Sequence, residues 1–178
     1  MRFSTGQCRP LFSPAFSPLL DMNIIEIEIP KDTIALESSR SPENMTYEDF
    51  IWCIGVVFAF KNSSLRVEAS LFGFTRKIVE ALRQELGIRE PVLLNDENGA
   101  YQINLSLSCG CVELIDLFGN GSAELSLKSL LIELKNRFAA ALNSLERAIP
   151  SLIANAEYNI IKVETIEMIE HALRPSFD

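Results

Sequence analysis

The chain has 178 residues, of which 48% are hydrophobic and 22% charged, with a formal net charge of −8. A chain of this length and composition folds around one substantial core, which excludes disordered and fibrous proteins. Its negative charge disfavours nucleic acid and membrane surfaces as partners, because both bind through Lys and Arg. A basic protein partner fits the charge, although many cytoplasmic proteins are acidic for solubility alone.

The first 21 residues differ from the rest of the chain. They hold Arg2 and Arg9, and prolines interrupt them at positions 10, 14 and 18. Prolines at this spacing break the continuous apolar helix of a secretory signal peptide. Residues 1–21 are therefore interpreted as a flexible leader or as sequence upstream of a true start at Met22, and residues 22–178 as a single domain. Without the leader, 14 basic residues stand against 23 acidic ones, a charge of −9.

In the amino-terminal half, apolar patterns predict strands. Residues 23–29 alternate isoleucine with glutamate and predict a half-exposed strand, and a second short strand is expected at 33–36. The run 50–60 is rich in β-branched and aromatic residues, which favours a strand buried on both faces. Residues 65–71 alternate as its hairpin partner. A helix is predicted over 72–86, with Gly87 as its left-handed C-cap.

The carboxy-terminal half contains the longest predicted helix, at 123–149, whose apolar residues recur every three or four positions. Further strands are expected at 91–94, 101–108, 112–118 and 160–163, and a terminal helix at 164–173. Adjacent antiparallel strands outnumber alternating β-α-β units. The pattern therefore predicts an α+β fold with an antiparallel or mixed sheet, a β-hairpin–helix unit and a long amphipathic helix packed on one face.

The turn Gly119-Asn120-Gly121 is the strongest candidate for a small-molecule site. It follows an apolar strand that contains Asp116 and precedes the predicted long helix. Glycines let the backbone approach a phosphate, and the first-turn N–H groups of a helix point at it. However, the third glycine of a dinucleotide fingerprint is absent, and Glu124 adds negative charge to the first helical turn. A structural strand-to-helix turn with Ser122 as N-cap is the simpler interpretation.

Other reactive groups are few. The four cysteines do not form a secreted framework, so reduced thiols in the cytoplasm are the simplest account. Cys109 and Cys111 lack a second ligand pair at zinc spacing, and the only histidine, His171, is expected on the surface of a helix end. Two carboxylate pairs are interpreted as solvated, Asp96/Glu97 and Glu113/Asp116. We predict no catalytic, cofactor-binding or metal-binding residue.

Without a reactive centre, a protein-interaction role is the favoured hypothesis. We predict a non-enzymatic cytoplasmic protein that masks a basic partner in the manner of an immunity protein or antidote, because complementary charge speeds encounter and sets specificity. Partner contacts are predicted at exposed acids, namely Glu26, Glu28, Asp96 and Glu97. The first alternative is a secretion-type chaperone, a homodimer formed through the 123–149 helix or a strand edge. The second is a small nucleotide- or S-adenosylmethionine-binding enzyme that uses Gly119-Asn120-Gly121.

Overall fold

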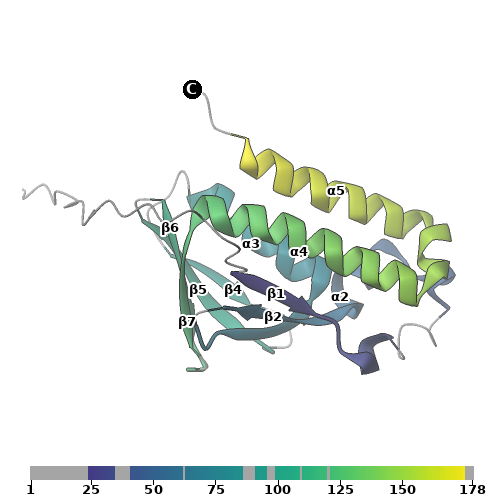
Figure 1. Ribbon diagram of the computed structural model, residues 1–178, viewed down its shortest axis with the longest axis horizontal. Helices are drawn as coiled ribbons and strands as arrows, with labels where there is room; N and C mark the ends of the chain where they lie inside the picture. The colour runs from purple at the N-terminus through teal and green to yellow at the C-terminus, as the bar shows by residue number, and fades with distance from the viewer. Residues whose placement is uncertain are drawn as a thin grey trace, which may run out of the picture.

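The computed structural model describes residues 24–34, 41–61, 63–85, 91–95, 99–108, 110–119 and 121–174. These ranges form two antiparallel sheets and a layer of helices, which confirms the predicted α+β fold (Figure 1). The predicted leader and the boundary at Met22 lie outside the described residues. Within the described ranges, no helix is both long and apolar enough to cross a bilayer.

The first sheet contains three antiparallel strands in the order β1-β2-β3. β1 (Ile25–Glu28) confirms the predicted isoleucine–glutamate strand. β2 (Gly55–Phe60) pairs with β3 (Arg66–Ser70) as the predicted hairpin. Alternate residues of the sheet face the core, and the residues between them, including Glu26 and Glu28, face solvent.

The apolar run at 50–60 forms two elements and not the single predicted strand. Its first residues belong to α2 (Tyr47–Cys53), and β2 begins only at Gly55. The reason lies just before the run, where Thr46 and Asp49 form a capping box. This box satisfies N–H groups of the first helical turn that otherwise lack a partner. A local polar signal therefore overrides the strand propensity of the apolar residues.

Two further predicted strands are helical. The described residues of the segment 33–36 belong to one helical turn. The predicted strand at 160–163 lies inside α5 (Ala156–Leu173), which also contains the predicted terminal helix. The physical reason is the buried N-cap Asn155, whose side chain accepts the N–H of Tyr158 at 3.0 Å. The short helical turns η1 (Pro42–Asn44) and η2 (Pro150–Ala154) precede α2 and α5.

The second sheet contains four antiparallel strands in the order β4-β5-β6-β7. Three of them confirm predicted strands: β4 (Val92–Asn95), β5 (Gln102–Ser108) and β6 (Cys111–Asp116). The turn between β5 and β6 contains Gly110 at a φ of 80°, a left-handed conformation that favours glycine. The fourth strand, β7 (Ser122–Ser126), lies where the sequence pattern predicts a helix. The strands thus divide into two sheets where one was expected.

The longest helix, α4 (Leu127–Ala148), begins four residues later than predicted. Ser126, and not Ser122, is its N-cap. The residues before it form β7, because Ala123 and Leu125 are buried while their neighbours are exposed, a period of two that belongs to a strand. The predicted apolar seam is confirmed from the helix start onward, since its members are buried or partly buried.

The helices α3 (Leu71–Glu85) and α4 pack against the sheets, and α5 packs on these two helices (Figure 1). α3 confirms the predicted helix, and its predicted C-cap Gly87 lies outside the described residues. Aromatic rings join the layers: Phe74 of α3 lies 4.7 Å from Phe58 of β2, between ring centroids. Phe72 of the same helix contacts the aromatic residues of the other two helices, Phe138 and Tyr158. Both sheets share this core, which leaves their outer faces to solvent.

Candidate interaction surface

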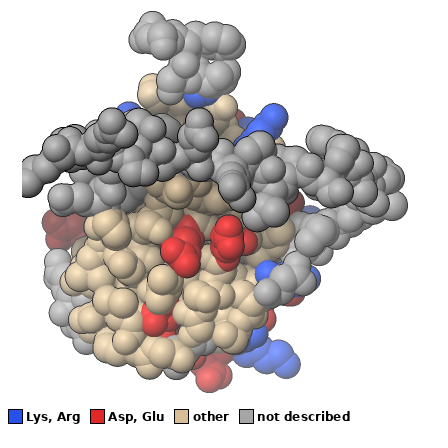
Figure 2. All heavy atoms as spheres, turned by 90° about the vertical axis from the view of Figure 1, so that its left-hand side faces the viewer, with Lys and Arg blue, Asp and Glu red and all other residues tan. Residues whose placement is uncertain are grey.

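The four-stranded sheet buries one face and exposes the other. Its inner face consists mainly of apolar side chains, most of them buried, among them Ile103, Leu114 and Leu125. Figure 2 views the side of the molecule that carries this sheet, where acidic side chains gather in the middle of an otherwise tan surface and Lys and Arg lie toward its margin. The outer sheet face is defined here by Leu93, Asn104, Ser106, Glu113, Ile115 and Glu124.

The strand register places two glutamates side by side on this face. Glu113 of β6 lies directly opposite Glu124 of β7, and such pairs have Cβ atoms about 4.5–5.5 Å apart. On the other side of Glu113, Ser106 donates a hydrogen bond to its Oε2 at 3.3 Å. Among the residues that the structure describes, no Lys or Arg forms an ion pair with either carboxylate. Glu113 and Glu124, the acid pair, are exposed and lack a compensating cation there.

Exposed apolar side chains lie beside the acid pair. Ile115 is the next outward residue along β6 and is 37% exposed. Leu93 lies in the same row, across Asn104, and is 50% exposed. In the turn after β6, Leu117 and Phe118 are 53% and 54% exposed. Apolar side chains grouped on an exposed face are typical of protein contact surfaces.

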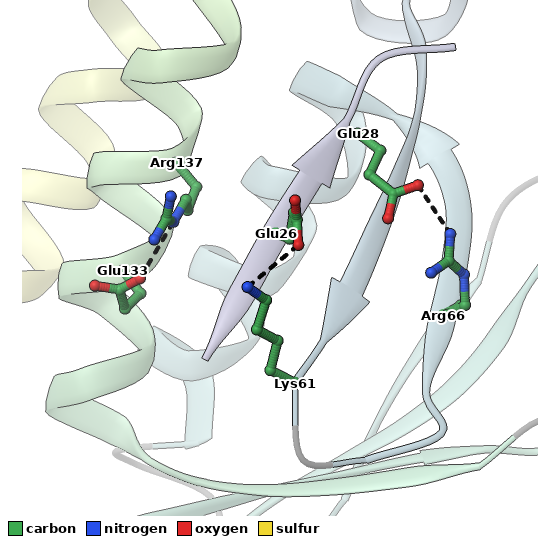
Figure 3. A network of polar contacts seen from close by, with 6 residues as sticks. All are labelled: Glu26, Glu28, Lys61, Arg66, Glu133 and Arg137. Carbon is green, nitrogen blue, oxygen red and sulfur yellow. Dashed lines mark hydrogen bonds and ion pairs between the residues drawn. The ribbon is translucent and has the colours of Figure 1, made fainter. Parts of the chain in front are cut away.

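The acids predicted as partner contacts have a different environment. Glu26 forms an ion pair with Lys61 at 3.3 Å, and Glu28 forms one with Arg66 at 2.9 Å (Figure 3). Both glutamates are exposed, as the pattern predicts, but each has a cation from a neighbouring part of the three-stranded sheet. The predicted contacts Asp96 and Glu97 lie outside the described residues.

The acid pair depends on a strand pairing that the sequence pattern did not predict. Glu113 and Asp116, considered above as paired carboxylates, lie on opposite faces of β6, and Asp116 is only 7% exposed. Glu124 was assigned to a helix, although the residues around it alternate between polar and apolar from Ser122 to Ser126. That alternation is the signal that identifies β7 as a strand.

The turn at Gly119 and Gly121 is a β-hairpin and not a strand-to-helix turn. The N–H of Asp116 donates to the carbonyl of Gly121 at 3.0 Å, and the N–H of Gly119 donates to the carbonyl of Asp116 at 3.2 Å. A Cβ atom at Gly121 would lie 2.2 Å from Oγ of Ser64, so glycine permits the close approach of the loop between β2 and β3. Because β7 follows the turn, the turn does not lie at a helix amino terminus. The nucleotide hypothesis assumed a helix directly after the turn, and that premise is wrong.

The remaining candidate groups are dispersed. Cys111 is exposed on β6, Cys53 is partly buried, and Cys109 lies outside the described residues. His171 is exposed in the last turn of α5. Over the described ranges, no group of three or more His, Cys, Asp or Glu residues is arranged to hold a metal ion.

A hollow of about 580 Å³ lies between the amino termini of α2 and α5. Three of the residues that line it are acidic, Glu43, Glu48 and Glu157. Each belongs to the first turn of a helix, where a carboxylate is stabilised by the helix dipole. The helix dipole therefore gives each of these acids a local stabilising interaction, which the acid pair on the sheet lacks.

Comparisons of the chain with protein-family models, with curated proteins and with solved structures found no match.

Proposed function

We propose that the protein is a non-catalytic binding protein that captures a basic protein partner on its outer sheet face. The observation that carries this proposal is the acid pair, because Glu113 and Glu124 oppose each other directly across two strands. Like charges in this position destabilise a sheet by roughly 0.2–1 kcal/mol. A Lys or Arg of a partner placed between them converts this repulsion into attraction, so a complex relieves the repulsion.

The rest of the face fits the same role. The net charge of −8 attracts a cationic partner from a distance and speeds encounter. Once the partner is docked, the exposed apolar side chains of Leu93 and Ile115, together with Phe118 in the turn after β6, are removed from water, which stabilises the complex. Ser106 and Asn104 separate the larger side chains and are short, so they leave the carboxylates accessible.

Within this class, an immunity- or antidote-type inhibitor of a basic cytoplasmic partner fits best. Such a protein requires a rigid acidic face that covers a basic functional surface, and it requires no reactive centre. The outer sheet face has this rigidity, because its strands are anchored by the buried side chains of the opposite face, such as Leu114.

Charge reversal tests the proposal. Tagged wild-type protein, the variant Glu113→Lys/Glu124→Lys and the matched control Glu26→Gln/Glu28→Gln are purified from the native cell at low salt. We expect a basic protein to accompany the wild type and the control but not the charge-reversed variant, and the purified pair to re-form a 1:1 complex that suppresses the partner's activity. An acidic partner, or one retained by the charge-reversed variant, contradicts the proposal.

A second candidate, the chaperone-type homodimer, is favoured by the outer side of α5. Ile160 and Val163 are 47% and 52% exposed there, and Ile153 of η2 is 55% exposed. The sequence predicts a dimer through the 123–149 helix or a strand edge, and the apolar seam of that helix, α4, is buried in the core. A homodimer in light scattering that becomes a monomer on Ile160→Lys supports this candidate, and a wild-type monomer excludes it.

A further inference from the structure

The outer sheet face has a repeat along β6 that restricts what can dock on it. Outward residues of a strand are spaced about 6.8 Å apart, twice the rise per residue. Along β6 this spacing separates Glu113 from Ile115, and Leu117, in the turn that follows the strand, is also exposed. An acidic position is therefore followed by an apolar one on the strand and by a further exposed apolar side chain in the turn. A complementary partner presents a cation followed by apolar side chains at similar intervals.

We infer that the segment docked on this face is a basic amphipathic helix lying along β6, and this inference rests on the proposed function. Residues four apart on a helix are separated by about 6 Å along its axis. A Lys or Arg at one position therefore reaches the acid pair while apolar residues one and two turns away lie over Ile115 and Leu117. The mismatch between the two repeats is less than about 1 Å per step, which long side chains absorb.

The hydrogen bonds of the docked backbone are a second reason to expect a helix and not an extended segment. A segment lying on the face of a sheet, and not along its edge, cannot hydrogen-bond to the strands beneath it. Buried backbone groups without partners are costly, and a helix satisfies its own N–H and C=O groups whereas an extended segment does not. The outer sheet face is also wide enough, because four strands span about 14 Å and a helix with its side chains is about 10–12 Å across.

The charge pattern fixes which helix fits. The acid pair is uncompensated among the described residues, so the docked cation meets no competing Lys or Arg there. Leu93 and Ile115 lie in the row beside it, with Asn104 between them. A helix that carries its basic residue on the same side as its apolar residues places the cation at the acid pair and the apolar residues over Leu93 and Ile115 at the same time. In a helix with the cation on the opposite side, only one of the two can contact the sheet. Either the acid pair or the apolar side chains of the sheet are then left without a matching group.

Three peptides of about 18 residues, a length at which helices form in water, test the inference on the full-length protein. The first is an Ala/Gln helix with Arg at one position and Leu four and eight residues later. The second carries two central prolines, which break the helix without changing its charge. The third has the same composition with Arg moved to the opposite side. Each is titrated into ¹⁵N-labelled protein, and the amide shifts and dissociation constants are measured.

We expect the first peptide to shift the amides of Glu113, Ile115 and Glu124 and to bind about ten-fold more tightly than the other two. The variant Glu113→Gln/Glu124→Gln weakens this binding by about ten-fold, whereas Glu26→Gln/Glu28→Gln leaves it unchanged. Equal binding of the helical and proline-containing peptides on this face overturns the helical inference and leaves the proposed function standing. Absence of binding by all three peptides also overturns the inference. The proposed function is tested separately: it fails if the cellular partner still binds the charge-reversed variant Glu113→Lys/Glu124→Lys.

Discussion

The two sheets of this protein each expose one face, and each face carries a pair of glutamates with a different electrostatic environment. On the three-stranded sheet, Arg66 reaches from β3 to Glu28 on β1, and Lys61 pairs with Glu26. On the four-stranded sheet, the neighbours of the acid pair are serines and apolar residues. Glu26 and Glu28 therefore each have a cation, whereas the acid pair has none among the described residues. Net charge alone does not locate a binding surface, because strand register decides which acids are paired.

The largest effect on the free energy of unfolding is expected when an inner residue of β6 is substituted and compared with an outer one. Leu114→Ala removes a fully buried side chain and is expected to lower the free energy of unfolding by about 2–5 kcal/mol. Ile115→Ala, on the outer face, is expected to change it by less than about 1 kcal/mol. Urea denaturation of both variants measures the difference. A loss at position 115 as large as that at position 114 contradicts the assignment of Ile115 to a contact surface.

Two substitutions, one on each sheet, are expected to change the free energy of unfolding by smaller amounts and in opposite directions. Glu124→Gln removes a like-charge repulsion and is expected to stabilise the fold by roughly 0.2–1 kcal/mol. Glu28→Gln removes an ion pair between half-exposed side chains and is expected to destabilise it by at most about 1 kcal/mol. Both differences are measured by denaturant unfolding at low ionic strength.

Salt provides the control for these two substitutions. Both effects are expected to shrink at high ionic strength, because counterions screen exposed charges. If Glu124→Gln instead destabilises the protein, the carboxylate has a stabilising partner and the proposed binding surface is wrong.

A third group of charges shows how an exposed acid is compensated between helices. Tyr47 donates a hydrogen bond to Glu164, and Arg76 approaches the same carboxylate at 3.2 Å. These two hydrogen bonds, that of Tyr47 first, lower the pKa of Glu164 below its ordinary value of 4.5. Because the folded-state pKa is the lower one, the interaction stabilises the fold above about pH 4.5 and is lost as the pH falls through the folded-state pKa.

The smallest predicted effect follows from this group. Tyr47→Phe is expected to lower the free energy of unfolding near neutral pH by less than about 1 kcal/mol, because solvent screens a carboxylate this exposed. The difference from the wild type should narrow as Glu164 becomes protonated at acid pH. Unfolding curves across this pH range measure the change. In a Glu164→Gln background the effect of Tyr47→Phe should no longer depend on pH, and a persistent dependence assigns it to another group.

Much of the fold follows from periodicity in the sequence. Strand alternation at 23–29 and 101–108 and the apolar seam of α4 predict elements that the structure confirms, since a period of two or near 3.6 shows which side chains are buried together. Two of the errors occur where a short polar feature overrides the pattern. Because of the capping box at Thr46, the first residues of the apolar run 50–60 form part of α2. Because of the N-cap Asn155, the predicted strand at 160–163 forms part of α5.

The sequence by itself determined that this chain is acidic, forms an α+β core and exposes one side of each amphipathic strand, because these properties depend on composition and on spacing along the chain. Only the tertiary structure decided which exposed acids have cations. That outcome depends on the register between β6 and β7 and between β1, β2 and β3, which brings together residues distant in sequence. A one-residue shift in register places the side chains of Glu113 and Glu124 on different partners, so no local pattern specifies their encounter.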